Sequence, residues 1–386
     1  MYDVIVCGAG PAGAVAATVL SRGGARVLLL DRARFPRPKL CGDTLNPGAL
    51  AVLRRLAMSG GFESSALPVD GMIVTGERGV RVRAPYGRGA RGLAIERRLL
   101  DAALLQAAIA AGARVEQGVL VRGPLLDNRA HDLQVRGIVM AGRDGRDLRV
   151  PAPLVIAADG RRSRLAVGVG LARQPRRPRR WAIGAYFEQV AGMTSFGEMH
   201  VRRGRYVGVA PLPSGLVNVC LVLPGPSSLP AVRGGFEDPE RLLRAAIDRD
   251  PALRERFAGA RMVAPPVMLG PLALDVPTPG LPGLLLAGDA AGFIDPMTGD
   301  GLRFAVRGGE LAADVALAAC AGRLLHPYRR LARLRRREFA AKWRFDRALR
   351  RLVGRETTVE LAGLAAFAAP WLLRRTIAFA GDVPAR

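Results

Sequence analysis

YDVIVCGAGPAG, residues 2–13, is followed by an alanine-rich segment that reaches residue 21 and by RVLLLD at residues 26–31. The first run is short, apolar and rich in β-branched residues, as expected of a buried parallel strand. The alanine-rich segment predicts a helix, and RVLLL predicts a second strand that ends on Asp31. Together the three pieces predict one βαβ unit at the start of an α/β fold.

The turn between the first strand and the helix has the spacing of a dinucleotide-binding loop. Gly8 permits the tight turn, Gly10 lets the backbone approach a pyrophosphate, and Gly13 lets helix and strand pack closely. The helix start then offers free N–H groups and partial positive charge to phosphates. Asp31 ends the second strand, where a carboxylate can accept ribose hydroxyls. The alternative is a glycine-rich turn that binds no ligand. It is disfavoured because the glycines lie directly before a predicted helix and are followed by Asp31 at the end of the next strand.

Later segments extend the α/β pattern. They predict a helix at residues 96–111 and strands at 115–121, 154–158 and 284–287. Two of these strands end in turns that contain an acid and a glycine, at Asp159-Gly160 and Gly288-Asp289. Such turns lie where ligands collect in an open α/β sheet. Asp289 could bind a ligand or cap a helix, and Asp159 could bind a ligand or only shape its turn.

The chain resembles the flavoproteins that share the para-hydroxybenzoate hydroxylase fold. Three fingerprints occur in the family's order: GAGPAG at 8–13, AADGRRS at 157–163 and AGDAAGFIDPMTGDGL at 287–302. The resemblance implies FAD as cofactor. It also implies a Rossmann-like FAD-binding domain with a parallel central sheet, an interleaved antiparallel-sheet substrate domain and C-terminal helices.

The same resemblance implies where FAD binds. In that family the acid at the position of Asp289 binds the ribityl chain, Arg97 contacts the ribityl–phosphate region, and the backbone of Val121 faces the adenine. The stretch with Pro296 and Gly299 lies against the isoalloxazine, and helix-start N–H groups could stabilise negative charge there. The predicted FAD-binding residues are Gly8, Gly10, Ala12, Gly13, Asp31, Arg32, Gly42, Arg97, Val121, Asp159, Asp289, Pro296, Gly299, Asp300, Gly301 and Leu302.

RFPRPKLCGDTL at residues 34–45 indicates the branch of the family. It resembles the segment of geranylgeranyl reductases that carries a Lys-x-Cys-Gly core beside the flavin and the substrate. Here the core is Lys39, Cys41 and Gly42, followed by Asp43. Cys41 and Asp43 are therefore the candidate catalytic residues, although Cys41 could also be a small buried hydrophobe. The halogenase branch is disfavoured because its Trp-x-Trp-x-Ile-Pro motif is missing; the nearest match begins at Trp181.

The fingerprints divide the chain into interleaved parts. The predicted domains are an FAD-binding domain at 1–62, 92–180 and 262–325, a substrate domain at 63–91 and 181–261, and a C-terminal helical region at 326–386. Segments 69–85 and 181–223 should form the substrate layer, because parts of the second segment alternate as antiparallel strands do. This layer has no dense cluster of acids or bases, which favours a lipophilic small-molecule substrate. A lone His200 there is more typical of a structural residue than of a catalytic one.

The net charge of +25 does not by itself predict nucleic-acid binding. Lysine occurs only at Lys39 and Lys342, so the excess is almost all arginine in an alanine-rich chain, which is typical of coding bias. Anionic lipid head groups are the more plausible partner. The cysteines and histidines have no metal-type spacing, so no metal is expected. We expect no signal peptide and a cytoplasmic protein, with the inner face of the membrane as an alternative location; no feature indicates an oligomeric state.

The C-terminal part predicts an arginine-rich helix at 324–351 and an apolar segment at 360–380 that Pro370 interrupts. That segment could cap the active site or lie in a membrane surface. The leading functional hypothesis is an FAD-dependent reductase of C=C bonds in a prenyl or other lipid chain. NAD(P)H or another donor would bind transiently, because no second dinucleotide-binding unit is visible. The alternatives are a monooxygenase of an aromatic, quinone or polyketide-like substrate, and a basic lipid- or nucleic-acid-binding protein with a vestigial flavin.

Overall fold

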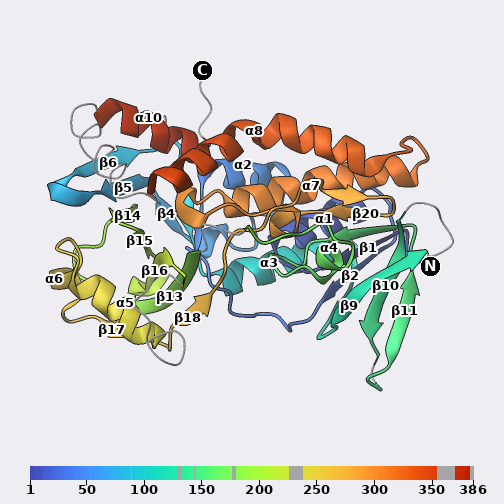
Figure 1. Ribbon diagram of the computed structural model, residues 1–386, viewed down its shortest axis with the longest axis horizontal. Coiled ribbons are helices and arrows are strands. Elements are labelled where there is room, and N and C mark those ends of the chain that lie inside the picture. Colours follow the sequence, from blue (N-terminus) through green and yellow to red (C-terminus); the bar gives the residue numbers. More distant parts are fainter. Residues whose placement is uncertain are drawn as a thin grey trace.

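The structure is a computed structural model that describes residues 1–87, 89–127, 133–142, 144–175, 180–225, 238–353 and 370–382. Figure 1 shows an elongated molecule with long helices along one side. A six-stranded sheet containing β1, β2 and β20 lies toward the right of that view, and an eight-stranded sheet containing β13 to β16 lies toward the left. The predicted α/β class, with a parallel central sheet, a second sheet and C-terminal helices, is confirmed.

The six-stranded sheet has the order β19-β20-β12-β1-β2-β8. Its strands are β1 (Val4–Cys7), β2 (Val27–Asp31), β8 (Arg114–Gln117), β12 (Leu154–Ala157), β19 (Gly280–Leu281) and β20 (Leu284–Leu286). All neighbours pair in parallel except β19, which is antiparallel to β20. The carboxyl ends of β1, β12 and β20 therefore meet at one edge, where the three fingerprints begin.

Both faces of this sheet are covered, which explains its continuous apolar runs. Val4 and Val6 pack against α1 (Pro11–Arg22), α3 (Arg97–Ala110) and α7 (Gly301–Cys320). The intervening Ile5 and Cys7 face the other way, because side chains alternate along a strand. They pack against a layer formed by β9 (Val121–Asp127), β10 (Gln134–Ala141), β11 (Asp147–Pro151) and α4 (Arg164–Gly168).

The single strand predicted at residues 115–121 is wrong. The chain instead leaves the six-stranded sheet after Gln117 and enters the three-stranded sheet at Val121. Gly118 lies between the two strands with a φ of +78°, a conformation that favours glycine. The β-branched residues indicate extended structure but cannot show that residues 115–117 and Val121 belong to different sheets.

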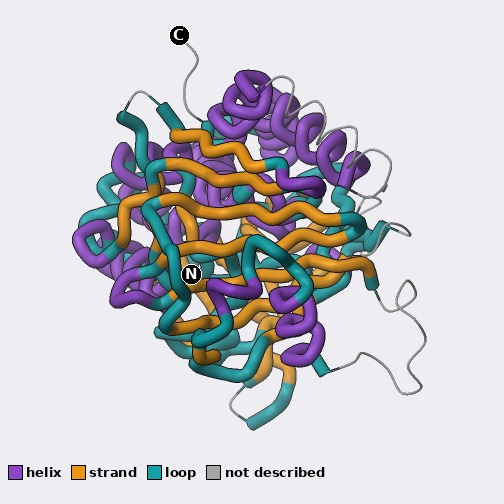
Figure 2. The backbone as a smooth tube through the Cα atoms, turned by 90° about the vertical axis from the view of Figure 1, so that its left-hand side faces the viewer, coloured by secondary structure: helices purple, strands orange, loops and turns teal. Residues whose placement is uncertain are grey.

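The eight-stranded sheet has the order β17-β13-β16-β15-β14-β5-β6, and β18 also pairs with β13. Its strands are β5 (Gly71–Thr75), β6 (Arg81–Pro85), β13 (Arg180–Glu188), β14 (Phe196–Arg202), β15 (Arg205–Pro211), β16 (Val217–Pro224), β17 (Arg261–Met262) and β18 (Val267–Leu269). Figure 2 looks at this end of the molecule and shows strands lying side by side. The two predicted segments do join in one sheet, but it is not wholly antiparallel, since β5 pairs with β14 in parallel.

One face of the eight-stranded sheet packs against α5 (Pro239–Asp248) and α6 (Arg254–Phe257). The alternate side chains, which point to the opposite face, line the main cavity of the protein. A small sheet, β3 (Thr44–Leu45), β7 (Gly92–Ala94) and β4 (Leu67–Val69), lies beside α2 (Pro47–Arg55). The short 3-10 helices are η1 (Glu63–Ser65), η2 (Glu77–Gly79), η3 (Pro213–Gly215), η5 (Gly288–Ala291) and η6 (Pro296–Thr298).

Two C-terminal helices, α8 (Pro327–Val353) and α10 (Pro370–Ala380), run along the top of the molecule in Figure 1. Pro370 is the first described residue of α10. The predicted apolar segment is thus described only from residue 370 onward; residues 354–369 lie outside the described part of the chain. The Lys342 ammonium of α8 donates to the carbonyls of Phe379 and Ala380 at the end of α10. Within the described ranges, no helix has the length and hydropathy needed to span a bilayer.

Candidate functional site

The main cavity has a volume of about 1120 Å³ and extends from the carboxyl ends of β1 and β12 to one face of the eight-stranded sheet. Most residues predicted to bind FAD line it, although they come from segments far apart in the sequence. Those that line it are Gly8, Gly10, Ala12, Asp31, Arg32, Gly42, Arg97, Val121, Asp159, Asp289, Pro296, Gly299, Gly301 and Leu302, together with Cys41. Gly13, Asp43 and Asp300 do not line the cavity, so they can affect binding there only through the residues that they contact.

The glycine-rich loop has the geometry that its sequence predicts. Gly8 has a φ of +99°, and a Cβ there would lie 2.4 Å from the carbonyl oxygen of Ala158. A Cβ on Gly13 would lie 1.7 Å from the carbonyl oxygen of Gly8, so only glycine permits this packing of helix on strand. Gly10 precedes α1, and a Cβ there would meet only the Arg37 guanidinium, at 3.5 Å. The loop therefore leaves open space beside Gly10, next to a helix start and a cation, as a diphosphate requires.

Asp31 ends β2 and holds the loop from the other side. Its two carboxylate oxygens each accept one backbone hydrogen bond at 2.8 Å, from Ala9 and from Ala33. A carboxylate has further lone pairs, so Asp31 can still accept ribose hydroxyls. Val121 lines the cavity near this end from the start of β9, and Arg32 follows Asp31 directly.

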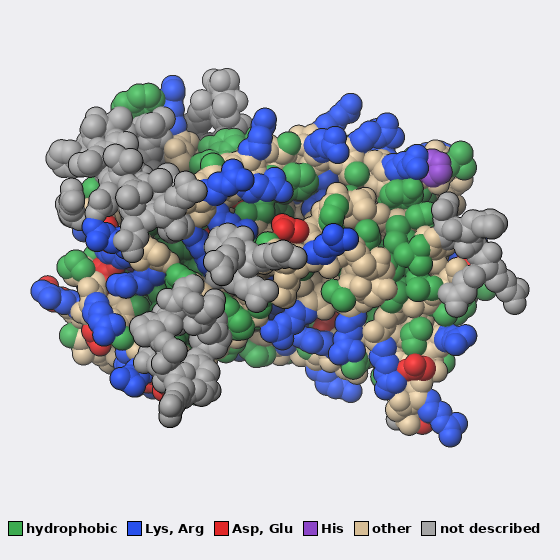
Figure 3. Space-filling view, viewed as in Figure 1, with side chains coloured by type: hydrophobic (Ala, Val, Ile, Leu, Met, Phe, Trp, Pro, Cys, Tyr) green, Lys and Arg blue, Asp and Glu red, His purple; other side chains and the backbone are tan. Residues whose placement is uncertain are grey.

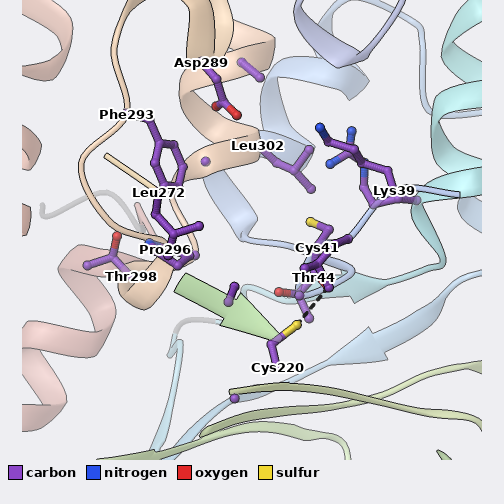
Figure 4. A pocket seen from close by; sticks show the side chains of 18 of the residues that line it. Lys39, Cys41, Thr44, Cys220, Leu272, Asp289, Phe293, Pro296, Thr298 and Leu302 are labelled. Carbon is purple, nitrogen blue, oxygen red and sulfur yellow. Dashed lines mark hydrogen bonds between the residues drawn. The ribbon is translucent and has the colours of Figure 1, made fainter. Parts of the chain in front are cut away.

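Charged groups gather around the middle of the cavity. Figure 4 shows Asp289 on one side and Lys39 on the other, with Leu302 between them in the view. Burial lowers the pKa of Lys39, and the attraction of Asp289 opposes that shift. Asp289 caps no helix here, since the residue that precedes η5 is Ala287 and makes no side-chain cap bond. Its carboxylate is thus placed beside the cavity, where a ribityl hydroxyl could reach it.

The structure is consistent with both roles considered for Asp159, shaping its turn and binding a ligand. One oxygen, Oδ2, accepts a hydrogen bond from the backbone N–H of Arg164 at 3.0 Å, which shapes the start of α4. The other oxygen, Oδ1, is buried and has no hydrogen-bond partner within the described residues. Burial raises the pKa of this carboxyl. A buried oxygen without a partner at a cavity wall fits a ligand that donates a hydrogen bond.

The loop from residue 295 to residue 302 forms the wall of the cavity at the predicted flavin-ring end. Gly299 has a φ of +70° and follows η6, and Gly301 begins α7. The Asp300 side chain does not line the cavity, and its carboxylate accepts hydrogen bonds from Asn46 and Lys342, both at 3.1 Å. Burial raises the pKa of Asp300 to about 6. Asp300 therefore ties the start of α7 to α8, and its side chain serves this loop rather than the cavity.

Arg97 is buried at the start of α3 and makes a two-pronged ion pair with Asp101 at 2.9 and 3.0 Å. Burial alone would lower the pKa of Arg97, but Asp101 raises it, so the guanidinium stays charged. Arg37 approaches the same carboxylate at 3.3 Å. Asp101 thus holds two cations that line the cavity.

Cys41 and Asp43 belong to one hydrogen-bonded cluster with residues of the eight-stranded sheet. The carbonyl oxygen of Cys41 accepts hydrogen bonds from Asn218 Nδ2 at 2.9 Å and from Cys220 Sγ at 3.3 Å. Figure 4 shows Cys220 below Cys41, with the Cys41 side chain turned toward the cavity. Burial raises the pKa of the Cys41 thiol. The thiol therefore keeps its proton at neutral pH.

Asp43 lies behind this cysteine and is 1% exposed. Its carboxylate accepts hydrogen bonds from Tyr186 Oη at 2.6 Å, from Asn218 Nδ2 at 2.7 Å and from the backbone N–H of Arg97 at 3.1 Å. Burial raises its pKa to about 6, against the effect of these donors. Asp43 also has a φ of +52°, an unfavourable conformation for a residue other than glycine, of the kind that clusters at functional sites. It does not line the cavity, so it can act only through its partners.

A second buried network, which the sequence did not reveal, anchors the loop at residues 295–302. Asp295 accepts a hydrogen bond from Tyr206 Oη at 2.5 Å and one from Arg180 at 3.0 Å. Arg180 also donates to the carbonyl of Arg350 on α8. Asp295 stands within the third fingerprint, which could have marked it, but its partners from β13 and β15 carried no signal. Across the whole site, the residues that the sequence did not assign to it are Arg37, Arg180, Tyr186, Tyr206, Asn218, Cys220 and Asp295.

His200 is a buried structural residue, as its isolation in the sequence favoured. Its Nε2 pairs with Glu198 and its Nδ1 with Thr75, both at 2.9 Å. Glu198 in turn makes ion pairs with Arg256 of α6. This network packs β14 against α6 and lies on the face of the sheet that points away from the predicted flavin.

Comparison with known proteins decides the family. Residues 1–203 match the model of the FAD binding domain family. Digeranylgeranylglycerophospholipid reductase 2 of Methanopyrus kandleri is 32% identical over 82% of this chain and 77% of its own length. The chain belongs to the geranylgeranyl reductase-like FAD-dependent oxidoreductases. The predicted cofactor FAD and the predicted enzyme class are thereby confirmed.

Other relatives and solved structures agree with this flavoprotein family. Menaquinone reductase of Mycolicibacterium smegmatis is 30% identical over 81% of this chain and 76% of its own length. A flavoprotein/dehydrogenase from Cytophaga hutchinsonii has a TM-score of 0.82 at 20% identity, covering 99% of this chain and 93% of its own. The flavin-dependent brominase Bmp2 also has a TM-score of 0.82, at 19% identity and with 99% and 94% coverage. These two structures show the fold alone.

Proposed function

We propose that this flavoprotein reduces C=C bonds in a prenyl-type or other lipid chain. The observation that carries the proposal is an apolar wall that continues from the predicted flavin-ring end across the eight-stranded sheet, with Cys41 at its border. The names of two relatives, a digeranylgeranylglycerophospholipid reductase and a menaquinone reductase, support a lipophilic substrate.

The apolar wall is formed by the cavity-facing side of the sheet and by the loops opposite it. Ala182, Val201, Tyr206 and Val222 are buried there and pack against Leu272. Partly buried apolar side chains complete the cluster: Leu40, Val74, Met199, Phe293 and Met297. Binding of a hydrocarbon chain to such a surface is favourable because it removes apolar area from water, which stabilises the complex by about 25 cal/mol for each Å² buried. It offers few polar groups for an aromatic alcohol or acid to pair with.

Reduction of a C=C bond adds a hydride to one carbon and a proton to the other. FAD, when bound and reduced, would supply the hydride and be reoxidised. We assign the proton to the Cys41 thiol, since burial keeps it protonated and its side chain faces the cavity. Arg97 lies close enough to stabilise the thiolate that remains, since its charge lowers the thiol's pKa. Asp43 would hold the Cys41 backbone in place through Asn218.

The reducing electrons would come from NAD(P)H or from another donor that binds transiently. Within the described ranges, one βαβ unit of the dinucleotide-binding type is present, and its loop is the one at Gly8 to Gly13. The FAD diphosphate is predicted to bind at that loop. A nicotinamide nucleotide would therefore have to reach the flavin through the open side of the cavity.

Anaerobic mixing tests the proposed reaction. Photoreduced enzyme mixed with geranylgeranyl lipids is expected to reoxidise its flavin and to yield a saturated chain, which the absorbance of oxidised flavin and mass spectrometry of the product would show. Reoxidation should need no oxygen. Oxygen uptake stimulated by substrate, with a hydroxylated product and no saturated one, would instead support a monooxygenase.

We further propose that α10 touches the cytoplasmic face of a membrane. Trp371 and Phe379 are 58% and 41% exposed, and Arg374 and Arg375 are exposed beside them. Ile377 of the same helix lines the cavity, so a lipid could pass from the membrane surface along α10. Co-sedimentation with vesicles should fall severalfold in Trp371→Ala, whereas equal sedimentation of variant and parent would contradict this contact.

A further inference from the structure

Asp346, in the middle of α8, is a buried acid that has no assigned role in the site described above. Its side chain belongs to a residue that is 2% exposed, and neither carboxylate oxygen has a hydrogen-bond partner within the described residues. An ionised carboxylate without partners is strongly disfavoured away from water. Burial accordingly raises the pKa of Asp346 to about 7. This group therefore gains or loses its proton close to neutral pH.

Carboxylates outnumber cations around Asp346, although the chain as a whole is basic. The net charge is +25, and Figure 3 shows Lys and Arg side chains over the whole visible face, with far fewer Asp and Glu. The charged side chains that face Asp346 or its neighbours come from four parts of the fold: Lys342 from α8 itself, Asp300 from the start of α7, Asp295 from the residue before η6, and Asp382 from the turn after α10. Asp300 and Asp295 both raise the pKa of Asp346, and Lys342 lowers it.

The other three acids each have a cation of their own. The pairs are Asp300 with Lys342 at 3.1 Å, Asp295 with Arg180 at 3.0 Å, and Asp382 with Arg303 at 2.5 Å. Asp346 makes no ion pair within the part of the chain that the structure describes. A proton is therefore the means by which this carboxyl can be neutralised where it lies.

Thr298 connects this acid to the main cavity. It ends η6, which packs against α8, and it lines the cavity next to Pro296, as Figure 4 shows. The Thr298 hydroxyl lowers the pKa of both Asp346 and Asp300, so it lies close to both carboxyls. Its oxygen is buried and has no hydrogen-bond partner among the described residues. A hydroxyl both donates and accepts hydrogen bonds, so Thr298 can pass a proton between the cavity and Asp346.

The position of Thr298 relates the acid to the flavin. Pro296 and Gly299, on either side of Thr298, are predicted to lie against the isoalloxazine, and both line the cavity. Phe345, the residue before Asp346, lines the cavity as well. Charges interact more strongly in a buried site than in water. Negative charge that develops at this end of the cavity should therefore raise the affinity of Asp346 for its proton.

We propose that Asp346 takes up a proton when the flavin is reduced, and that the Thr298 hydroxyl carries this proton between the cavity and the carboxylate. Two electrons pass from the reductant to the flavin, and one proton from water joins Asp346, which becomes neutral as negative charge develops nearby. Reciprocity requires that an ionised Asp346 disfavours reduction and lowers the midpoint potential of the flavin. The inference depends on the bound FAD and not on the proposed reduction of a lipid.

The midpoint potential of the bound flavin, measured on both sides of pH 7 with dithionite as reductant, tests this proposal. Below pH 7 Asp346 holds its proton in both redox states and adds nothing to the pH dependence. Above pH 7 the uptake of one extra proton should steepen the dependence by about 30 mV for each tenfold change in proton activity. Asp346→Asn should lack this steepening and should have the higher potential there. The same bend in Asp346→Asn and in the parent would overturn the proposal.

Two substitutions of Thr298 test the role of its hydroxyl. Thr298→Val has nearly the same shape but removes the group that lowers the pKa of Asp346, so the bend should move to higher pH. Thr298→Ser keeps the hydroxyl and should leave the bend where the parent has it. FAD content and circular dichroism would be measured first in both variants. Identical bends in the valine and serine variants would remove Thr298 from the proposal.

Infrared difference spectroscopy of the parent gives a reading that needs no variant. Above pH 7, reduction should produce a new band of a protonated carboxyl that shifts in heavy water, and its absence would overturn the proposal even if Asp346→Asn failed to bind FAD. The band should be missing in Asp346→Asn and present in Asp248→Asn. Asp248 is the matched control, because it is exposed at the end of α5, on the sheet face opposite the cavity.

Thermal unfolding of the apoprotein tests the protonation of Asp346 apart from the flavin. The folded state holds this proton more tightly than the unfolded chain, so the stability that Asp346 contributes is lost as the pH rises through 7. Asparagine carries no charge at any pH. Asp346→Asn should therefore unfold at a higher temperature than the parent above pH 7, by a margin that grows with pH. Equal pH dependence of Tm in the two proteins would contradict the titration on which the proposal depends.

Discussion

Replacing Gly10 by valine is expected to give a folded protein that has lost FAD. The backbone at Gly10 has φ −70° and ψ −176°, which any residue adopts, so the change imposes no strain. The new Cβ would point into the cavity and meet only the movable end of Arg37, at 3.5 Å. Valine would fill the space that the predicted diphosphate needs beside the helix start. FAD affinity should fall at least about 100-fold, since each charge-assisted hydrogen bond that is lost contributes about 1.5–3 kcal/mol.

The flavin absorbance of the purified protein and titration of the apoprotein with FAD measure this loss, and circular dichroism reports folding. Gly60→Val is the matched control, since a Cβ at Gly60 meets no atom within 4 Å and the residue is exposed outside the cavity. Gly13→Ala should behave differently again and fail to fold, because its Cβ would lie 1.7 Å from a backbone oxygen. Full FAD content in Gly10→Val would contradict the placement of the diphosphate.

Replacing Asp43 by asparagine is expected to lower turnover about 100-fold, the effect of misplacing reacting groups by a small distance. Three donors converge on this carboxylate, from Tyr186, Asn218 and the backbone of Arg97. An asparagine has one acceptor oxygen and one NH₂ group, so its NH₂ group would face at least one of these three donors. Asn218 would then lose its orientation, and with it the backbone of Cys41. Asp43 is accordingly a positioning residue.

The pH dependence distinguishes positioning from a general loss of structure. Since burial raises the pKa of Asp43 to about 6, the carboxylate gains a proton as the pH falls through 6. Turnover of the parent should therefore fall on the acid side of pH 6, and the variant should lack this limb. Stability runs in the opposite direction, because the folded state holds this proton more tightly than the unfolded chain. The stabilising contribution of Asp43 is full below about pH 4 and is lost as the pH rises through 6.

Asp147→Asn provides the matched control for this prediction. Asp147 pairs with Arg122 at the surface of the three-stranded sheet, and both side chains are largely exposed. Its removal should change neither turnover nor the acid limb. An acid limb that persists in Asp43→Asn would assign the titration to another group and would contradict the positioning role of Asp43.

The sequence could predict the cofactor and the fold because their determinants are local. The strand, turn and helix around Gly8 to Gly13 lie within thirty residues, and the short-range packing of Gly13 on the carbonyl of Gly8 requires glycine at position 13. The later turns at Asp159 and Asp289 each follow a single buried strand. Parallel pairing then brings these turns to one edge of the sheet, a consequence of the α/β pattern itself.

The sequence missed the partners of the site for a physical reason. Asp43 is 143 residues from Tyr186 and 175 residues from Asn218, and Asp295 is 115 residues from Arg180. None of these contacts leaves a periodic or local signal. They exist because β13, β15 and β16 present their alternate side chains to the loops of the other sheet.

By itself, then, the sequence determined that this chain holds FAD and belongs among the reductase-like flavoproteins, since contiguous residues form the nucleotide loop and the fingerprints. Only the tertiary structure decided which side chains from distant segments meet one another. Strand pairing placed Asn218 on Asp43 and turned Asp300 toward Lys342. Such neighbours are set by the register of strands distant in sequence, and that register is fixed by burial of whole sheet faces rather than by any short motif.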